Sequence, residues 1–445
     1  MMINIPKEVL YILEKLNDNG FDTYIVGGCI RDSFMNRIPK DWDVTTSALP
    51  SEIMKVFCEE KTIETGRRFG TITVIKNSKP IEITTFRSEG DYTDRRRPGW
   101  VEFEKDIKAD LSRRDFTINS MAYSPIKGLV DPFGGREDIN NKLIKTVGNS
   151  KRRFNEDGLR LLRGIRFATE LNFNIEVSTY ESIVELKDNL FEVSMERIRD
   201  EFFKILLTKK PSKGILLLVN TGLIDHIIPE IVDTVDFNQY NPHHDKNIFD
   251  HILCVVDKSP EDIESRLAAF FHDIGKPVTF TLDEKGIGHF YGHDKLGEEI
   301  AIKVLKRLKS PKRLILTVSS LIREHMIYHN ELKNKGLKRL INRVGEENIF
   351  KLLQLMRADI LCGLSTKDLD VIDLLEDRIK NILNKKQILH VKDLAIGGKD
   401  LMDIGISQGP RIGEILNYLL DKVMEDENLN TKGNLLAIVK DKFLF

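Results

Sequence analysis

The stretch that decides the fold runs from residue 24 to residue 46 and reads YIVGGCIRDSFMNRIPKDWDVTT. Its apolar start predicts a short buried strand, and the glycine pair at 27–28 predicts a tight turn into a helix. After that helix, WDVTT (42–46) predicts a second strand. Successive side chains of a strand point to opposite faces, so Asp41 and Asp43 face the same side, roughly 7 Å apart. The pattern therefore predicts a strand, a glycine turn, a helix and a strand that presents two carboxylates together.

These two aspartates are candidate ligands for a divalent metal. Carboxylate oxygens suit hard cations such as Mg²⁺, and two such ions can hold the attacking and leaving oxygens of a phosphoryl transfer. Gly28 lets a phosphate approach the backbone, and Arg31 lies one turn into the following helix, within reach of the same phosphate. Glu82, in the strand IEITTF (81–86), is a candidate third carboxylate. The alternative interpretation is an exposed strand with alternating charge.

Outward from this stretch, the sequence predicts an α+β protein. Helices and strands alternate in the first 145 residues. Helices are expected over 1–20, 50–59 and 112–123, and strands over 71–75 and 81–86. Strand patterns largely stop after DPFGGREDI (131–139), and from about residue 152 the apolar residues recur with a helical period. We therefore expect an α/β head followed by an all-helical remainder. The parts are 1–145, 146–235, 236–365 and 366–445, with a sub-boundary near the polar, turn-rich segment 237–247.

Composition predicts a soluble globular protein. The chain has 445 residues, of which 41% are hydrophobic and 31% charged, so it can build several buried cores. No apolar run in the sequence is long enough to cross a bilayer, and the amphipathic N-terminus differs from a secretory signal. The four cysteines lie far apart without a CxxC pair, which favours reduced thiols. We therefore expect a cytoplasmic location and no membrane partner.

Arginine is concentrated between residues 87 and 166, although the net charge of the chain is only −1. The guanidinium group binds phosphate through forked hydrogen bonds, so this density favours a polyphosphate or nucleic-acid surface over an ordinary solvated face. The arginines concerned are Arg87, Arg95, Arg96, Arg97, Arg113, Arg114, Arg136, Arg152, Arg153, Arg160, Arg163 and Arg166. The segment that contains Arg113 and Arg114, DLSRRDFTINSMAY (110–123), could hold sugar hydroxyls and phosphate, or could be a capped basic helix.

The segment NEDGLRLLRGIRFA (155–168) predicts one amphipathic helix. At about 100° per residue, its leucine, isoleucine and alanine side chains fill one arc of the helix. The other arc carries Asp157, Arg160, Arg163 and Arg166. A carboxylate beside a guanidinium can present donors and acceptors to a base edge, while neighbouring arginines bind a triphosphate. A solvated face would more often mix lysine with glutamate, so this helix is a candidate nucleotide-recognition element.

Five motifs in a fixed order carry a resemblance to a known family. They are GGCIRD with DWD, RRDFTIN, DPFGGREDI, EDGLRLLR and SMERIRDEF, across roughly residues 5–230. They resemble the motifs of bacterial class II tRNA nucleotidyltransferases, the CCA-adding enzymes and poly(A) polymerases. The resemblance implies a nucleotidyltransferase-superfamily head followed by a helical neck, body and tail. Residues 146–235 would then be an RNA-binding neck, and residues 366–445 a tail that holds the tRNA elbow.

The same resemblance implies residue roles. The aspartates Asp41 and Asp43 would bind the catalytic Mg²⁺. The nucleotide-contacting residues would be Gly28, Arg31, Arg114, Asp157, Arg160, Arg163 and Arg166. Gly28 and Arg31 would contact the phosphates. Asp157 and Arg160 would act as a protein template that pairs with the edge of the incoming C or A.

The implied reaction is template-independent addition of CCA to the 3′ end of tRNA. The 3′-hydroxyl of the RNA would attack the α-phosphorus of CTP or ATP, and pyrophosphate would leave. Family members that add only CC lack the flexible segment before the RRD motif, whereas RSEGDYTDRRRPGWVEF (87–103) is present here. We therefore expect full CCA addition, with an A-adding specialist or a poly(A) polymerase as the alternatives.

A second group of candidate residues lies in the helical part 236–365. The apolar segment LAAFFHDIGKP (267–277) contains an adjacent His and Asp, which are costly to bury unless they are paired or bind metal. With residues elsewhere it resembles the H…HD…D signature of HD phosphohydrolases, which implies an HD domain, a second divalent metal and phosphodiesterase or phosphatase activity. The candidate ligands are His251, His272, Asp273 and Asp359, with His293 and His325 as further candidates. The alternative is a helical pattern kept as structure without metal.

Two rival interpretations concern the whole chain. One is an HD phosphohydrolase with a retired nucleotidyltransferase head, and the other is a non-enzymatic RNA-binding scaffold. Both predict no nucleotide incorporation. The carboxylates and arginines of the head are all present, which favours the nucleotidyltransferase.

Overall fold

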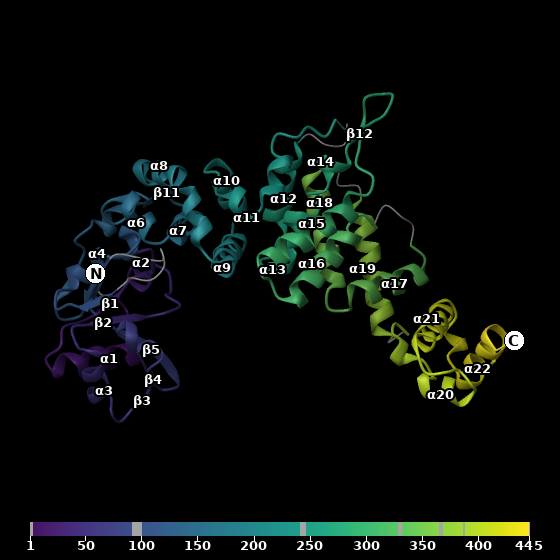
Figure 1. The fold of residues 1–445 in the computed structure, drawn as a ribbon, viewed down its shortest axis with the longest axis horizontal. Coiled ribbons are helices and arrows are strands. Elements are labelled where there is room, and N and C mark those ends of the chain that lie inside the picture. Colours follow the sequence, from purple (N-terminus) through teal and green to yellow (C-terminus); the bar gives the residue numbers. More distant parts are fainter. Residues whose placement is uncertain are drawn as a thin grey trace. The chain divides into compact units, whose positions relative to one another are not determined.

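The computed structural model describes residues 3–90, 100–240, 246–327, 332–364, 368–385 and 388–444. The chain forms two compact units, residues 1–229 (unit 1) and residues 230–445 (unit 2). Among the described residues, unit 1 holds the large sheet, and unit 2 is helical apart from one short hairpin (Figure 1). No helix in the described ranges is long and apolar enough to cross a membrane. The predicted fold class, an α/β head followed by helices, is confirmed.

Unit 1 is built on a seven-stranded mixed sheet with strand order β3-β4-β5-β2-β1-β8-β9. Its strands are β1 (Thr23–Val26), β2 (Asp43–Thr46), β3 (Lys61–Ile63), β4 (Thr71–Lys76), β5 (Lys79–Thr85), β8 (Ala122–Ser124) and β9 (Gly128–Val130). β2 and β5 run parallel with Val44 beside Ile83, and the other neighbours are antiparallel. Asp43 directly precedes Val44, and Glu82 directly precedes Ile83, so these two carboxylates lie at the same level of neighbouring strands.

The predicted strand, glycine turn, helix and strand are present as β1, α2 (Gly28–Phe34) and β2. Every residue of β1 is buried. Gly27 between β1 and α2 has a φ of +83°, which L side chains rarely adopt, so the turn requires glycine. Two further helices of the head are α1 (Lys7–Asp18) and α3 (Pro50–Val56), and Figure 1 shows them beside the sheet.

The rest of unit 1 is mainly helical. Its helices are α4 (Ile107–Ser112), α5 (Gly135–Asn140), α6 (Ser150–Glu156), α7 (Leu159–Leu171), α8 (Val177–Glu185), α9 (Met195–Leu206), α10 (Pro211–Asn220) and α11 (Ile224–Ile227). Two small strand pairs complete it, β6 (Arg87–Glu89) with β7 (Val101–Phe103) and β10 (Leu143–Ile144) with β11 (Asn174–Ile175). The apolar arc predicted for 155–168 is buried on α7, where Leu161, Leu162 and Ile165 are fully buried.

The helix predicted over 112–123 is wrong. α4 ends at Ser112, and the chain continues through a 3₁₀ turn at Thr117–Asn119 into β8. Phe116 is extended and fully buried, and it bridges to Thr146. The Asp115 side chain accepts a hydrogen bond from the Phe116 backbone N–H (2.8 Å), a local bond that competes with helical pairing.

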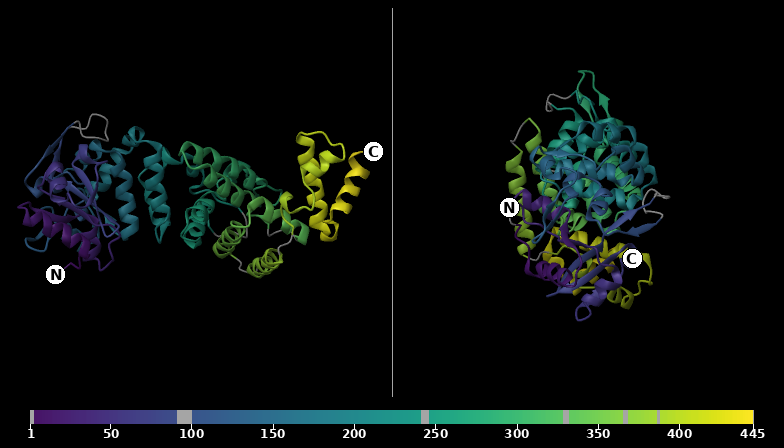
Figure 2. Two further views of the ribbon diagram at one scale, coloured as in Figure 1. Left: turned by 90° about the horizontal axis from the view of Figure 1, so that it is seen from below. Right: turned by 90° about the vertical axis from the view of Figure 1, so that its left-hand side faces the viewer.

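Unit 2 is a stack of helices. They are α12 (Ile248–Lys258), α13 (Ile263–Phe271), α14 (Lys276–Thr279), α15 (His293–Arg307), α16 (Lys312–Glu324), α17 (Asn334–Val344), α18 (Ile349–Cys362), α19 (Leu369–Asn384), α20 (Gly398–Asp403), α21 (Pro410–Glu425) and α22 (Lys432–Phe443). The hairpin of β12 (Thr281–Leu282) and β13 (Gly288–His289) projects from the helices around it (Figure 2). The last three helices share an apolar core that includes Leu401, Leu419 and Leu435. The finer division of the chain at residues 146, 236 and 366 stays a prediction.

Unit 2 also contains a disulfide between Cys254 of α12 and Cys362 of α18. The expectation of four reduced thiols is therefore wrong for this pair, while Cys29 and Cys58 are free. The two cysteines are 108 residues apart in the sequence, and only the packing of α12 against α18 brings them together.

Candidate active site and metal centre

Three carboxylates of unit 1 line one cavity of about 650 Å³: Asp41, Asp43 and Glu82. All three side chains keep exposed surface. Even so, partial burial raises the pKa of the Asp43 carboxyl group. The charge of Arg114 lowers this pKa, whereas the charges of Glu82 and Asp41 raise it further. A divalent cation here would relieve the repulsion among the carboxylates, so the donor set fits a hard metal ion.

The glycine turn brings cationic groups to the same place. A Cβ atom added at Gly27 would lie 3.4 Å from Arg114 Nη1 and 4.0 Å from Asp43 Oδ2. Arg31 is buried, and its Nη1 donates to Asn119 Oδ1 (2.8 Å), while a Cβ added at Gly28 would lie 3.6 Å from its Nη2. The structure therefore places Gly28, Arg31 and Arg114 around one turn beside Asp43.

Arg114 is held by one carboxylate and retains an unused donor. Its Nη2 lies 3.2 Å from Asp110 Oδ2, and its buried Nε has no hydrogen-bond partner among the described residues. Asp110 is fully buried, and burial by itself would raise its pKa. The positive charges of Arg113 and Arg114 have the larger effect, so the pKa of Asp110 is lowered. A buried donor without a partner is costly, so Arg114 is suited to bind an acceptor that arrives with a ligand.

The single helix predicted over 155–168 is wrong at Asp157. The chain breaks between α6 and α7, where Asp157 is extended and its Oδ1 accepts from the Leu159 backbone N–H (3.0 Å). Gly158 follows directly, and a Cβ there would lie 2.4 Å from the Asn189 carbonyl oxygen. Asp157 therefore lies just before α7, bonded to the backbone of its first residue, instead of lying on its face.

Asp157 is paired with an arginine that the sequence analysis missed. Arg197 of α9 donates to both carboxylate oxygens of Asp157, at 3.2 and 2.8 Å. A carboxylate offers about four acceptor positions, and these bonds with that from Leu159 use three, so one stays available. Arg197 belongs to the SMERIRDEF motif, and that motif was the available signal for it.

The three arginines of α7 are also held by carboxylates of unit 1. Arg160 pairs with Glu156 (2.7 Å), Arg163 with Asp115 (2.6 Å), and Arg166 with Glu201 (2.6 Å) and Glu170 (2.8 Å). Asp115 is buried; burial opposes its ionisation, but Arg163 and Arg160 lower its pKa all the same. The arginines are thus fixed in position by acidic partners, and they are not bare donors as the sequence pattern indicated.

The segment 87–103, on which the expectation of full CCA addition depends, is described only in part. Residues 91–99 lie outside the described residues, and they include Arg95, Arg96 and Arg97. The flanking residues form β6 and β7, with Arg87 opposite Phe103.

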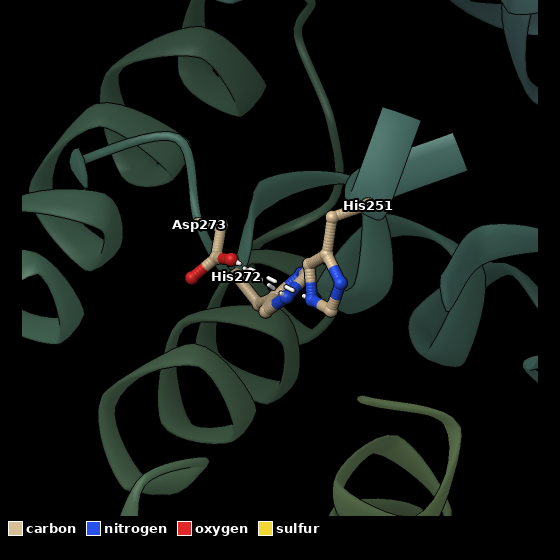
Figure 3. A group of neighbouring side chains, drawn as sticks. All are labelled: His251, His272 and Asp273. Carbon is tan, nitrogen blue, oxygen red and sulfur yellow. Dashed lines mark ion pairs between the residues drawn. The ribbon is translucent and has the colours of Figure 1, made fainter. Parts of the chain in front are cut away.

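In unit 2, six titratable side chains from separate parts of the chain meet in one buried cluster, which we call the histidine–aspartate centre. They are His251 of α12, His272 and Asp273 after α13, His293 at the start of α15, His325 after α16, and Asp359 of α18. His251 Nε2 lies 2.8 Å from Asp359 Oδ1 and 3.7 Å from Asp273 Oδ2, and His272 Nε2 lies 3.3 Å from Asp273 Oδ2. Figure 3 shows His251, His272 and Asp273 turned toward one another.

Two groups of three ligand atoms in this centre converge to within 4.8 Å, and both contain Asp273. The first is His251, His272 and Asp273, and the second is Asp273, His293 and His325. Across the described residues, convergence of this kind occurs only here, so Asp41, Asp43 and Glu82 do not share it. The structure thus gathers all four predicted ligands and both further candidates.

Hydrogen bonds to the backbone orient three of these imidazoles. His272, His293 and His325 each direct Nδ1 at a backbone carbonyl, of Ala269 (2.8 Å), Phe290 (2.7 Å) and Ile322 (2.7 Å). In a neutral imidazole this places the proton on Nδ1 and turns the Nε2 lone pair toward the centre. His293 Nε2 and His325 Nε2 then face each other at 3.3 Å, an arrangement that a shared cation or proton stabilises.

Two of the four imidazoles are in the neutral form that binds metal. Burial opposes protonation of His272, but Asp273 outweighs it and raises the pKa of His272. Burial lowers the pKa of His293, and burial together with His293 and His272 lowers that of His325 to about 4, so both are neutral at pH 7. Burial opposes ionisation of Asp273 and Asp359, but the neighbouring His272 and His251 lower their pKa values. His272 Nε2 and Asp273 Oδ2 are buried without a hydrogen-bond partner of acceptable geometry, although Lys276 Nζ lies 2.7 Å from Asp273 Oδ2. The donor set fits a divalent ion bound by nitrogen and oxygen.

Comparison with known proteins places the chain among nucleotidyltransferases. A family model described as the poly A polymerase head domain matches residues 23–145. A second, described as an RNA and SrmB-binding site of polymerase A, matches residues 172–234. A third, described as tRNA nucleotidyltransferase domain 2, matches residues 280–439. The chain is 34% identical over 430 residues to the CCA-adding enzyme of Pediococcus pentosaceus, covering 96% of each chain. It is 30% identical over 436 residues to that of Streptococcus thermophilus, covering 98% of this chain and 96% of the relative.

Solved structures agree with this result. The CCA-adding enzyme of Bacillus stearothermophilus in complex with CTP matches with a TM-score of 0.75 and 26% identity, over 98% of this chain and 97% of the other. The fold is shared with the Thermotoga maritima CCA-adding enzyme complexed with tRNA, at a TM-score of 0.56 and 22% identity, over 98% and 96% of the two chains. On the strength of its nearly full-length relatives, this chain belongs to the CCA-adding enzyme family of nucleotidyltransferases.

Proposed function

We propose that this protein adds C, C and A to the 3′ end of tRNA, with CTP and ATP as substrates, in the cytoplasm. The observation that carries the proposal is the position of Asp43, which lines a cavity together with Asp41 and also lies beside the turn at Gly27 and Arg114. Acidic groups for a metal and basic groups for phosphate thus meet in unit 1. This is the arrangement that nucleotidyl transfer needs.

In this mechanism the chain binds and orients the two reactants. Asp41 and Asp43 would hold Mg²⁺, which supplies charge neutralisation at the α-phosphate when bound. Arg31 and Arg114 would bind the triphosphate, and the absent side chain of Gly28 lets it approach the backbone. The 3′-oxygen of the RNA then forms a bond to the α-phosphorus, the bond between the α-phosphorus and its bridging oxygen breaks, and pyrophosphate leaves.

Nucleotide choice is proposed to depend on the break between α6 and α7. Asp157 would accept a hydrogen bond from the exocyclic amino group that both cytosine and adenine carry. Arg160, held by Glu156, would donate to the acceptor on the same base edge. Arg163 and Arg166 would continue the nucleotide site as positive charges fixed by Asp115 and Glu201.

The RNA partner is proposed to extend over the helical parts. The tail 366–445 would hold the tRNA elbow, and the neck 146–235 would contact RNA near the 3′ end. Full CCA addition is proposed over the two alternatives, an A-adding specialist and a poly(A) polymerase, because the segment 87–103 is present in the sequence.

The test is incorporation of labelled CTP and ATP into a tRNA that ends before its CCA, with Mg²⁺ present. Wild-type protein is expected to incorporate both nucleotides, and Asp41→Asn is expected to abolish both. Asp18→Asn is the matched control, since it removes an exposed carboxylate at the end of α1. Absence of incorporation by the wild type would favour an HD phosphohydrolase with a retired head, or an RNA-binding scaffold.

A second activity is supported by the histidine–aspartate centre. We propose that His251, His272, Asp273 and Asp359 bind a divalent metal, which would make this part of unit 2 an HD-type phosphohydrolase domain. The observation that carries this is the convergence of His251, His272 and Asp273, whose ligand atoms lie within 4.8 Å of one another. When bound, the metal would supply Lewis-acid activation of a phosphoester, and Lys276 would supply positive charge for the phosphate.

Metal analysis of the purified protein, with hydrolysis of 2′,3′-cyclic nucleotides as the readout, tests this activity. His272→Ala is expected to remove both the metal and the hydrolysis while CMP incorporation by unit 1 continues. A wild-type protein that holds no metal in unit 2 would instead support the metal-free alternative, in which the helices keep the pattern as structure.

A further inference from the structure

Two cross-links join α12 to α18, one helical turn apart. His251 Nε2 and Asp359 Oδ1 lie 2.8 Å apart, and Cys254 and Cys362 form the disulfide. Each pair is separated by 108 residues, so the cysteine follows the metal-ligand candidate by three positions on both helices. Equal spacing on both helices means that α12 and α18 run parallel here, with the disulfide directly beneath the ligand pair.

The disulfide secures the end of α18. Cys362 is the last residue of that helix, and Asp359 lies in the same final turn. Terminal turns of helices open more readily than their interiors, and the position of Asp359 therefore depends on what fastens this turn. Besides the contact of Asp359 with His251, this turn is held by the bond to Cys254 and by a hydrogen bond from Lys246 Nζ to the Cys362 carbonyl oxygen (3.1 Å).

The bond is accessible from one side only. Cys362 is 2% exposed, whereas Cys254 is partly exposed. A reductant can therefore approach the Cys254 sulfur, with the buried Cys362 sulfur as the leaving group. In a reducing compartment a disulfide is more often transient or redox-sensing than structural.

We propose that Cys254 and Cys362 form a redox-sensitive clamp on the histidine–aspartate centre, so that the disulfide form binds divalent metal more tightly than the dithiol form. This rests on the metal site proposed above. The oxidised clamp holds α12 and α18 in the register that joins His251 to Asp359. Reduction frees the last turn of α18, and the carboxylate of Asp359 then has to be ordered when the metal binds.

The redox step is a two-electron exchange. A thiolate of a dithiol reductant attacks Cys254 Sγ, the S–S bond breaks, and Cys362 leaves as a thiolate that takes up a proton. The second thiol of the reductant then displaces Cys254, which also takes up a proton, and the reductant becomes a disulfide. In the reverse direction hydrogen peroxide accepts the two electrons, and its O–O bond breaks. The two cysteine thiols lose their protons as they join, and two molecules of water form.

The experiment measures Mn²⁺ affinity of the full-length protein in both redox states. Asp41→Asn and Asp43→Asn are present in every sample, so that Mn²⁺ binding by unit 1 does not obscure unit 2. Counting thiols after denaturation verifies each state, because the chain has four cysteines and the oxidised form should show two free. We expect about tenfold tighter Mn²⁺ binding in the oxidised form.

Cysteine variants assign the effect to the clamp. Cys254→Ser with Cys362→Ser is expected to bind as weakly as the reduced protein and to ignore oxidant. Cys58→Ser is the matched control, because it removes an exposed free thiol of unit 1, and it should keep the full redox response. The oxidised and reduced forms of the protein that keeps all its cysteines are compared without any cysteine substitution. A double variant that misfolds would therefore not affect that comparison.

Adding His272→Ala separates failure of the clamp from failure of the metal site. Tighter oxidised binding that disappears with His272→Ala supports the clamp. Equal affinity in both redox states, again abolished by His272→Ala, overturns the clamp and leaves the metal site standing. Binding that His272→Ala does not change in either state overturns the metal site and the clamp with it.

Discussion

The two candidate metal sites differ in how much of the coordination shell the protein supplies. In unit 1, Asp41, Asp43 and Glu82 keep exposed surface in a shared cavity, and they are not gathered within 4.8 Å of one another. In unit 2, buried imidazoles and the buried carboxylate of Asp273 converge to that distance. Mg²⁺ takes six oxygen ligands, so the carboxylates of unit 1 leave positions for water and nucleotide phosphates. We infer that unit 1 acquires its metal with the substrate, whereas unit 2 can hold a resident ion.

The largest effect is expected from Asp43→Asn in unit 1. The change removes a metal-binding charge at constant size, and a metal contributes several kcal/mol to phosphoryl transfer, so CMP incorporation into tRNA should fall about 10³-fold. Metal content and cyclic-nucleotide hydrolysis of unit 2 should be unaffected. Incorporation within a few-fold of wild type would show that Asp43 is not a metal ligand of the reaction.

Asp273→Asn should have the next largest effect, and it should be confined to unit 2. Asp273 belongs to both converging groups, so its loss should lower divalent metal affinity by more than about 100-fold. The measurement is metal retained after dialysis, compared with Asp294→Asn, which changes a carboxylate in the first turn of α15 outside the cluster. Retention of metal by Asp273→Asn would contradict the view that unit 2 holds its ion without help from a substrate.

Asp157→Ala tests nucleotide choice in unit 1. A good bidentate contact contributes about 1–3 kcal/mol of base discrimination, so preference for CTP and ATP over UTP and GTP should fall about 5- to 150-fold. Triphosphate binding should change less. Arg197→Met should weaken the same preference by a smaller factor, because it leaves Asp157 without its partner. Arg199→Met on the same helix is the control. Unchanged discrimination in Asp157→Ala would refute the template role.

Glu82→Gln asks whether unit 1 uses a third carboxylate. Glu82 lies at the level of Asp43 on the neighbouring strand, so its loss should lower turnover at least about tenfold and raise the Mg²⁺ requirement. The readout is CMP incorporation across a Mg²⁺ titration. Turnover and metal dependence that both stay at wild-type values would restrict the metal site to Asp41 and Asp43.

Lower pH should weaken the two sites through different groups, by less per pH unit than any of these substitutions. Burial lowers the pKa of His272, but the negative charge of Asp273 has the larger effect. The pKa of His272 is therefore raised above 6.5. The imidazole must lose that proton to bind metal, so metal affinity of unit 2 should fall as pH drops through this pKa, up to about tenfold per pH unit. The pKa of Asp43 is raised above 3.8, so its protonation would weaken unit 1 at lower pH. A flat Mn²⁺ affinity of unit 2 between pH 8 and 6 would contradict this.

Local patterns predicted much of the fold and the candidate ligands. The strand at 24–26 follows from an apolar run before a glycine turn, and the strand of Asp43 follows from the alternating pattern of WDVTT. The His272-Asp273 pair is visible because it interrupts an apolar helix. The predicted helices at 112–123 and 155–168 failed where side chains bond to the backbone, at Asp115 and Asp157. Such bonds depend on conformation, and helical periodicity does not register them.

Two long-range pairings were out of reach of the sequence. Arg197 meets Asp157 across 40 residues, and Cys254 meets Cys362 across 108. Nothing in the spacing of these residues distinguishes them from ordinary surface arginines or reduced thiols. Their pairing follows from how α9 packs on α7 and α12 on α18, which is decided by the buried faces of the helices.

The central claim, that unit 1 adds CCA, is tested most directly by sequencing the 3′ ends of the product. The wild-type protein is incubated with a tRNA that ends before its CCA, together with Mg²⁺, CTP and ATP. The account predicts that C, C and A are added in that order and that addition then stops. A tract of adenosines, addition of A only to a tRNA that already ends in CC, or no extension at all would contradict it.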